Sequence, residues 1–136
     1  MPEISGIAHV ELSVRDLEVS VAWYCRLLDA REIFRGTNAE GGFTACAIIE
    51  PQSKVVLAFT QHDAEESSIF SPRRAGLDHL SFLAPSREAL DEWVARLKDQ
   101  GIPFDGVDDY GTHVAITFVD PDGIALEMIA RTPRPA

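Results

Sequence analysis

The fold is decided by a stretch that occurs twice in the chain. Residues 76–82 are Gly-Leu-Asp-His-Leu-Ser-Phe, and 70 residues earlier, residues 6–12 are Gly-Ile-Ala-His-Val-Glu-Leu. At that offset the chain matches itself at 12 of the 46 positions from Gly6 to Pro51, where chance would give roughly 3. The sequence therefore predicts two copies of one unit.

Each copy is predicted to be a βαβββ unit. In its first strand, polar and apolar residues alternate, so that His9 and His79 lie on the face opposite the apolar positions. Asp16 and Ser86 are suited to cap the helices that follow, which we expect to end near Asp29 and Gln100. Further strands are expected at residues 32–36, 43–50 and 54–60, and at residues 103–106, 113–119 and 124–130. These patterns favour an α+β fold, in which two βαβββ modules form a curved mixed sheet around a pocket.

The length of 136 residues is that of one ordinary domain. We expect a single domain over residues 1–136, with module one at about 6–60 and module two at about 76–130. A polar linker at about 61–75 would join them, and its part from residue 65 to 74 is either a solvated loop or a lid over the site.

Composition excludes several classes of protein. The formal net charge of −10 argues against nucleic acid and anionic membranes as partners. No apolar stretch approaches the ~20 residues of a membrane helix, and the N-terminus lacks the pattern of a signal peptide. The two cysteines, Cys25 and Cys46, form no metal or disulfide motif, and both are expected to be small buried apolar groups. We therefore expect a cytoplasmic location.

Three residues on the polar face of these strands suggest a metal centre. In the last strand, Leu126 and Met128 are assigned to the helix side, which places Glu127 on the same face as His9 and His79. Two imidazoles and one carboxylate are a ligand set that leaves positions open for substrate or water on a divalent metal. A single His or Glu of this kind is more often an ordinary polar strand residue, but the three together favour a site.

The chain has paired βαβββ modules that each open with His, and residues 120–127 are Asp-Pro-Asp-Gly-Ile-Ala-Leu-Glu. In these two features it resembles the vicinal oxygen chelate superfamily. That family includes glyoxalase I, extradiol dioxygenases, fosfomycin-resistance transferases and bleomycin-resistance proteins, and the resemblance extends over residues 6–130. It implies a metal held by His9, His79 and Glu127, a small substrate that chelates it through neighbouring oxygens, and a homodimer. Iron(II) or manganese(II) is favoured as the metal, with zinc(II) or nickel(II) as alternatives. In relatives, the ligands of one site come from one chain or from two swapped chains.

The branches of this family differ in their ligands. Glyoxalase-like isomerases carry a fourth ligand at a position that here corresponds to Leu57 by strict offset or to Ala58 by strand parity. Neither residue binds metal, although Gln61 or His62 at the strand's end could replace it. The three-ligand set is that of dioxygenases and fosfomycin enzymes.

The chain also departs from the residue patterns of both three-ligand branches. The dioxygenases carry a His that acts beside the metal ligands, and the corresponding position here is approximately Ser53 or Lys54. They also carry a Tyr at a position that corresponds approximately to Thr117. Glu11 replaces the Thr of the fosfomycin enzymes, and its carboxylate would repel a phosphonate substrate.

Other polar residues on the inner face are candidate contacts for a substrate. Glu11 is a candidate general base, and His113 is a candidate acid–base group. Candidate pocket residues are Ser13, Thr60, Ser81, Tyr110 and Thr117. The repeated aromatic residues Trp23, Trp93, Phe34 and Phe104 are expected to pack helix against sheet.

Two function classes follow. The first is a metal-dependent enzyme of dioxygenase or lyase type that acts on a small oxygen-chelating molecule. The second is a metal-free protein of bleomycin-resistance type that sequesters a drug or metabolite. The presence of all three candidate ligands favours the enzyme, and stoichiometric metal that is lost on changing Glu127 would distinguish the two.

Overall fold

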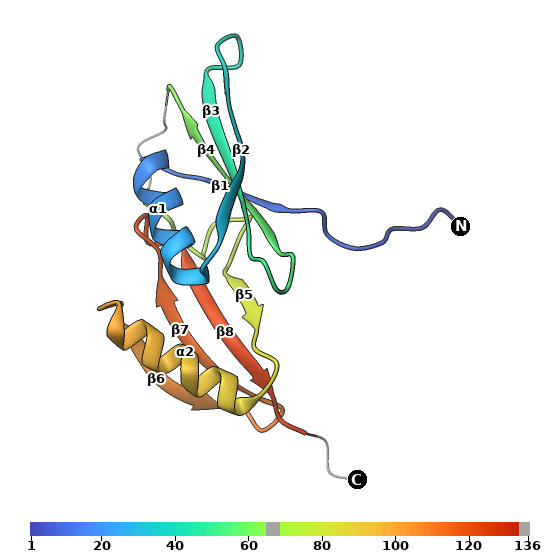
Figure 1. Ribbon diagram of the computed structural model, residues 1–136, viewed down its shortest axis with the longest axis vertical. Helices are drawn as coiled ribbons and strands as arrows, with labels where there is room; N and C mark the ends of the chain where they lie inside the picture. Colours follow the sequence, from blue (N-terminus) through green and yellow to red (C-terminus); the bar gives the residue numbers. More distant parts are fainter. Residues whose placement is uncertain (65–68, 134–136) are drawn as a thin grey trace. The chain divides into compact units, whose positions relative to one another are not determined.

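The computed structural model describes residues 1–64 and 69–133. The chain divides into two compact units, Met1–Ser67 and Ser68–Ala136, and each contains one βαβββ repeat (Figure 1). The predicted α+β fold with two βαβββ modules is confirmed. Of the expected linker, residues 61 and 62 belong instead to a strand of the first unit, and residues 65–68 lie outside the described part of the chain.

The first unit is a four-stranded mixed sheet with one helix. Its elements are β1 (Val10–Ser13), α1 (Leu17–Leu28), β2 (Arg31–Asn38), β3 (Phe43–Ile49) and β4 (Val56–His62). The strand order is β1-β4-β3-β2, with β1 parallel to β4 and the other neighbours antiparallel. The helix packs on β3 and β4, so the opposite face of the sheet is left uncovered within this unit (Figure 1).

The second unit repeats this arrangement. Its elements are β5 (Leu80–Leu83), α2 (Arg87–Asp99), β6 (Phe104–Asp109), β7 (His113–Val119) and β8 (Ala125–Arg131). The strand order is β5-β8-β7-β6, with β5 parallel to β8. The helix packs on β8. The two histidines, His9 and His79, each immediately precede the first strand of their unit.

Local signals fix where both helices begin and end. The side chains of Asp16 and Ser86 accept hydrogen bonds from the backbone N–H groups of Val19 and Ala89, as expected for N-caps. The first helix ends at Asp29, which has a φ of 53°. The predicted helix boundaries are therefore confirmed to within a residue.

The apolar residues between helix and sheet form the core of each unit. In the first unit, Tyr24 and Phe59 are fully buried with their ring centroids 4.7 Å apart. In the second unit, Leu90, Leu126 and Met128 are buried between α2 and the sheet. Leu126 and Met128 are the residues that strand parity assigns to the helix side.

One expectation about the core is wrong. Phe34, on the edge strand β2, is 59% exposed and its ring lies over Gly36 instead of under the helix. The repeated Trp23, Trp93 and Phe104 are half-buried. The repeat of an aromatic residue at equivalent positions therefore does not imply that both copies are in the core.

Two acidic residues organise the turns that lead into the last strands. The Glu50 carboxylate accepts hydrogen bonds from the backbone N–H groups of Gln52 and Ser53 and from the Ser53 hydroxyl. The buried Asp120 carboxylate accepts from the backbone N–H groups of Asp122 and Ile124. Both residues act within their own turn, which fixes where β4 and β8 start.

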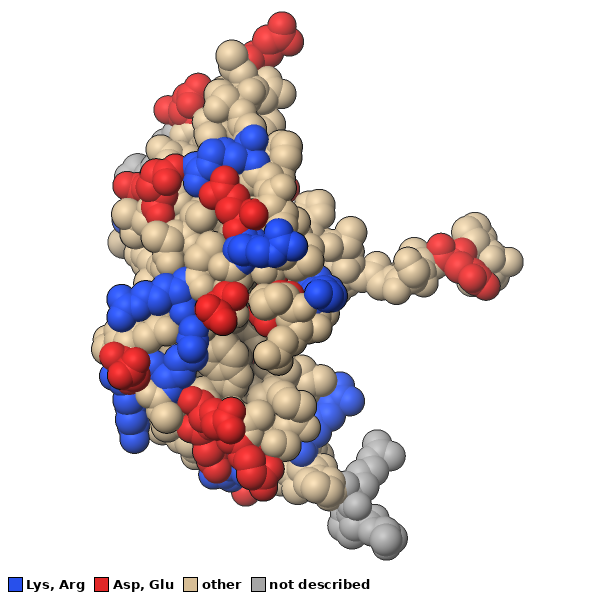
Figure 2. Space-filling model, viewed as in Figure 1, with Lys and Arg blue, Asp and Glu red and all other residues tan. Residues whose placement is uncertain are grey.

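Charged residues of both signs share the surface. Figure 2 shows Lys and Arg atoms interspersed with Asp and Glu atoms on the face that it displays. No helix among the described residues is long and apolar enough to cross a membrane.

Candidate metal centre and substrate pocket

The face of the second sheet opposite α2 brings together His79 and Glu127, two of the three predicted metal ligands. Ser81 on β5 and Thr117 on β7 are the register partners of Glu127 on β8, so these side chains form a row on one face. The Ser81 hydroxyl donates a 2.7 Å hydrogen bond to Oε1 of Glu127. Nε2 of His79 lies 3.7 Å from the same oxygen.

Asp78 contacts one ring nitrogen of His79 and leaves the other available to bind a metal. Its Oδ1 atom lies 2.6 Å from Nδ1 of His79. Because a carboxylate oxygen accepts, Nδ1 carries a ring proton, and in the neutral imidazole the lone pair is then on Nε2, which lies 3.7 Å from Oε1 of Glu127. Such carboxylate–histidine pairs orient imidazoles that bind metals.

This geometry fits two ligands of one divalent metal ion. The distance of 3.7 Å between Nε2 of His79 and Oε1 of Glu127 is compatible with a shared ion at bond lengths of about 2.0–2.2 Å to each. The Glu127 side chain is only 18% exposed. Within the described residues, no group of three or more His, Cys, Asp or Glu side chains could by itself hold a metal ion, and the third predicted ligand, His9, belongs to the first unit.

The first unit carries a similar histidine–carboxylate pair, but its carboxylate stands on a different strand. Nε2 of His9 lies 3.6 Å from Oε2 of Glu11, which is on β1. The Thr60 hydroxyl donates a short hydrogen bond to Oε1 of Glu11. Thr60 is buried and is the register partner of Ser13. The predicted pocket residues Glu11, Thr60 and Ser13 thus lie on one face with His9.

Ala58 is the counterpart of Glu127. It is the register partner of Glu11 in the first unit, just as Glu127 is the partner of Ser81 in the second. Leu57, the other candidate, is 1% exposed in the core. The structure therefore selects the position given by strand parity, which holds no metal ligand.

The two residues considered as replacements make other contacts. The side-chain Oε1 of Gln61 accepts a 2.8 Å hydrogen bond from the backbone N–H of Leu17 at the start of α1. The ring of His62 packs against Phe43, with centroids 5.9 Å apart. Neither side chain contacts His9 in any interaction that the described residues show.

His113 and Tyr110 lie at one end of β7, away from Glu127. Their rings stack with centroids 4.9 Å apart, and Nδ1 of His113 lies 3.0 Å from the Thr112 hydroxyl. His113 pairs with Arg131, four residues beyond Glu127 on β8, which corresponds to about 13 Å along the strand. This distance places His113 outside contact with the His79–Glu127 pair.

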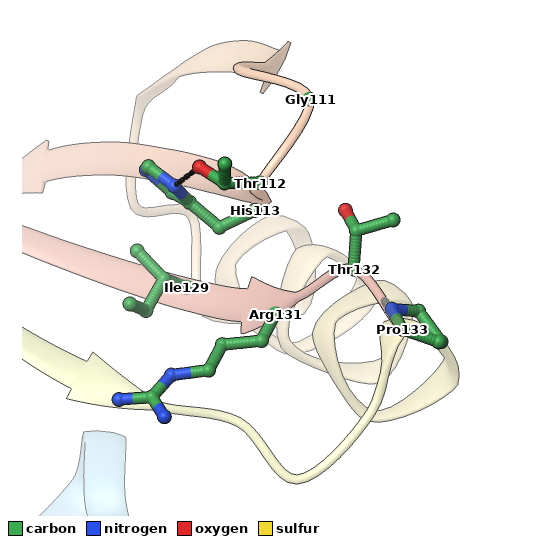
Figure 3. A pocket seen from close by; sticks show the side chains of 7 residues that line it. All are labelled: Gly111, Thr112, His113, Ile129, Arg131, Thr132 and Pro133. Atoms are coloured by element: carbon green, nitrogen blue, oxygen red, sulfur yellow. Dashed lines mark hydrogen bonds between the residues drawn. The ribbon is translucent and has the colours of Figure 1, made fainter. Parts of the chain in front are cut away.

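An open pocket of about 540 Å³ lies at that end of the second sheet (Figure 3). Its lining residues are Gly111, Thr112, His113, Ile129, Arg131, Thr132 and Pro133. Sequence analysis identified His113 but missed Arg131 and, at the metal centre, Asp78. Both could have been found: Arg131 shares strand parity with Glu127, and Asp78 directly precedes His79.

The cysteines take no part in either arrangement. Cys46 is buried, and burial followed by the nearby Glu32 raises the pKa of its thiol to about 11. Burial also raises the pKa of Cys25, which is half-buried. A raised pKa keeps a thiol protonated and unreactive at neutral pH, so neither is a candidate nucleophile.

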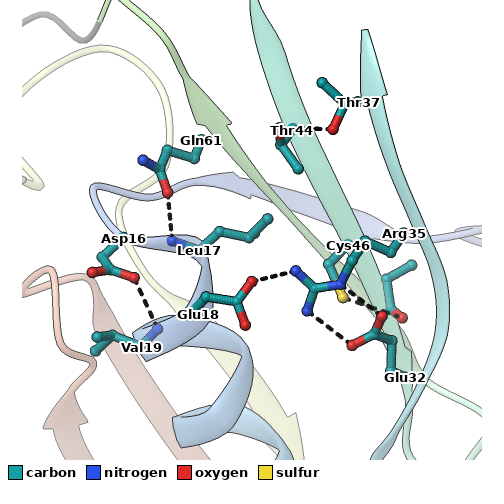
Figure 4. Close-up of polar contacts among 11 residues, drawn as sticks. Asp16, Leu17, Glu18, Val19, Glu32, Arg35, Thr37, Thr44, Cys46 and Gln61 are labelled. Atoms are coloured by element: carbon teal, nitrogen blue, oxygen red, sulfur yellow. Dashed lines mark hydrogen bonds and ion pairs between the residues drawn. The ribbon is translucent and has the colours of Figure 1, made fainter.

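A charged network joins α1 to the edge strand β2 of the first sheet (Figure 4). Arg35 on β2 donates to Glu32 on the same strand and to Glu18 on α1. Its hydrogen bonds hold the pKa of the Glu32 carboxyl below its usual range. These contacts link helix to edge strand, which is a structural role.

Comparisons with known proteins agree with this architecture. The family model described as Glyoxalase/Bleomycin resistance protein/Dioxygenase superfamily matches residues 6–128. The crystal structure of a glyoxylase/bleomycin resistance protein/dioxygenase domain from Frankia sp. EAN1pec is similar with a TM-score of 0.88 and 32% identity, covering 98% of this chain and 96% of that one.

Two longer proteins are also similar. Catechol-2,3-dioxygenase of Bacillus subtilis is 31% identical over 134 residues, which are 97% of this chain and 44% of that protein. Metapyrocatechase of Geobacillus stearothermophilus is 27% identical over 127 residues, which are 93% of this chain and 35% of that protein. The chain thus spans less than half the length of these two relatives.

Proposed function

We propose, from the premise that this chain belongs to the Glyoxalase/Bleomycin resistance protein/Dioxygenase superfamily, that it is a divalent-metal-dependent enzyme. Its substrate would be a small molecule that chelates the metal through adjacent oxygens. The ligands would be His9, His79 and Glu127, a dioxygenase-like set. Iron(II) or manganese(II) fits this mixture of imidazole and carboxylate donors, with zinc(II) or nickel(II) as the alternatives.

The observation that carries the proposal is the arrangement around His79. Asp78 directs the Nε2 lone pair of this histidine toward the side of Glu127. The Ser81 hydroxyl fixes one carboxylate oxygen of Glu127. A histidine oriented by one carboxylate and facing another is typical of a metal site, and an ordinary surface histidine needs neither.

Three polar residues of the inner face, Ser81, Thr60 and Glu11, then have specific roles. A bound divalent metal supplies a Lewis acid with open positions for the substrate's oxygens. Ser81 positions the Glu127 carboxylate. In the first unit, the Thr60 hydroxyl occupies Oε1 of Glu11, which leaves Oε2 to accept a proton from the substrate. Glu11 is thus the proposed general base.

The glyoxalase-like alternative is less well supported. It needs a fourth ligand, and the corresponding residue is Ala58. Gln61, which could have replaced it, binds the N-terminus of α1. The other alternative is a metal-free protein that sequesters a drug or metabolite, and measuring the metal content of the protein tests it.

We further propose a homodimer located in the cytoplasm. The edge strand β2 exposes Ile33 and Phe34, which a second copy could cover. Both cysteines are free thiols, as is usual in reducing compartments. Light scattering on the purified protein tests the dimer: a monomeric mass at micromolar concentration would contradict it.

The decisive experiment is metal content by mass spectrometry after anaerobic loading with iron, manganese, nickel or zinc. Wild type is compared with Glu127→Ala and with the control Glu92→Ala, which removes an exposed carboxylate of α2. We expect about one metal per chain in wild type and control, and almost none in Glu127→Ala. Equal metal in Glu127→Ala would refute the ligand assignment, and no metal in any protein would favour the sequestering function.

A further inference from the structure

The pocket at the end of β7 and β8 contains a positive charge, Arg131, that no carboxylate among the described residues neutralises. The chain has 22 acidic and 12 basic residues, yet Arg131 forms no ion pair with any residue in 1–64 or 69–133. Other arginines of the chain, Arg35 and Arg87, do pair with neighbouring carboxylates. The guanidinium of Arg131 is therefore available to a ligand.

The residues around Arg131 complete a site for an anion. His113, its register partner on β7, is held by stacking on Tyr110 and by the Thr112 hydroxyl at Nδ1. The Thr112 hydroxyl can donate to Nδ1, which leaves the ring proton on Nε2 as a donor to a ligand. A guanidinium and an imidazole N–H are both donors suited to a carboxylate.

One apolar side chain, that of Ile129, lies between this end of the pocket and Glu127. In Figure 3, His113, Ile129 and Arg131 project to the same side of the sheet, and the Arg131 side chain turns back beside Ile129. Ile129 lies midway between Arg131 and Glu127 on the same face of β8 and pairs with the buried Ala115. The distance along the strand from Glu127 to Arg131 is about 13 Å between α-carbons.

We propose that Arg131 and His113 form a carboxylate-binding subsite, and that the substrate carries a carboxylate separated by an apolar segment from the oxygens that chelate the metal. The substrate part of this statement rests on the proposed function. The subsite itself does not, because all of its residues lie in the second unit and none of them is a metal ligand. The planar guanidinium of Arg131 can hold one carboxylate through two parallel hydrogen bonds.

The test measures binding to the metal-free full-length chain by ¹H–¹⁵N NMR titration. The probe is 3-phenylpropionate, which has an apolar ring and a carboxylate, and the neutral probe is 3-phenylpropionamide. Wild type is compared with Arg131→Gln, with Arg131→Lys, and with the control Arg31→Gln on the exposed edge strand of the first unit. Inorganic phosphate is titrated in parallel.

We expect the carboxylate to shift the amide signals of His113 and Ile129, and to bind Arg131→Gln roughly tenfold or more weakly than wild type. Arg131→Lys should be intermediate, because it keeps the charge without the planar fork. The amide should bind weakly and equally to all proteins, and Arg31→Gln should behave as wild type. Signal dispersion in each spectrum verifies that the variants are folded.

Three results would overturn the subsite: no binding of the carboxylate to wild type, equal binding to wild type and Arg131→Gln, or tighter binding of phosphate than of the carboxylate. Metal content of Arg131→Gln, expected to equal that of wild type, separates this proposal from the proposed function. Loss of the metal centre would leave anion binding to the apo protein unchanged, whereas loss of the subsite would leave metal content unchanged.

Discussion

Ala58 occupies in the sheet of the first unit the register position that Glu127 occupies in the sheet of the second. Each is paired with the second residue of the unit's first strand, Glu11 in one case and Ser81 in the other. The carboxylate near the histidine has therefore changed strands between the two repeats. It stands on the last strand in the second unit and on the first strand in the first unit.

This relationship predicts that a fourth ligand can be restored. The double variant Glu11→Ser with Ala58→Glu copies the arrangement of Ser81 and Glu127. We expect its manganese affinity to rise roughly tenfold over wild type, since an added carboxylate strengthens binding of a hard cation. Chelator competition measures the affinity, and Glu11→Ser alone is the control, with affinity near wild type. A folded double variant without the gain would contradict the proposed place of His9 among the ligands.

Asp78 should matter for metal binding although it is not itself a ligand. Because it orients His79 through a 2.6 Å contact at Nδ1, Asp78→Asn is expected to weaken metal affinity by about 10–100-fold. Asp99→Asn, at the exposed end of α2, is the matched control. If Asp78→Asn binds metal as wild type does, His79 needs no such orientation and the carboxylate contact is only a surface interaction.

Two phenylalanines of the first unit should differ sharply in their effect on stability. Phe59 is fully buried against Tyr24, so Phe59→Ala is expected to lower the free energy of unfolding by about 3–5 kcal/mol. Phe34 is 59% exposed, and Phe34→Ala should change it by less than about 0.5 kcal/mol. Urea denaturation below the concentration of any dimer measures both. Similar losses for the two variants would show that Phe34 is packed in the native state.

The turn at Glu50 should make stability depend on pH. Burial alone would raise the pKa of Glu50, but hydrogen bonds from Ser53 and Gln52 hold it below its usual value of 4.5. On acidification the unfolded chain therefore takes up the proton first. The stability that Glu50 contributes is complete above pH 4.5 and is lost as the pH falls through the lower pKa of the folded state.

Glu50→Gln removes this titration, so its unfolding free energy should fall less steeply with decreasing pH than that of wild type. Urea denaturation at pH 6.0, 4.5 and 3.5 measures the slopes, and Glu40→Gln, at an exposed position, is the control. Parallel curves for wild type and Glu50→Gln would mean that the hydrogen bonds of the turn do not favour the ionised carboxylate.

The sequence by itself determined the two βαβββ units, the helix boundaries and the face on which His79 and Glu127 lie. These features depend on local signals: alternation of side chains along a strand, the period of a helix, and capping residues such as Asp16 and Ser86. Each can be recognised within a few residues of the chain, and the repeat doubles the evidence for it.

Only the tertiary structure decided between Leu57 and Ala58 as the counterpart of Glu127 in the first unit. The turn before β4 has six residues, 50–55, whereas the turn before β8 has five, 120–124. This extra residue, accommodated with Lys54 at a φ of 63°, changes the offset from 70 to 69. The exposure of Phe34 and the lack of an ion-pair partner for Arg131 among residues 1–64 and 69–133 were likewise beyond the sequence, because they depend on which residues of distant segments come to lie beside them.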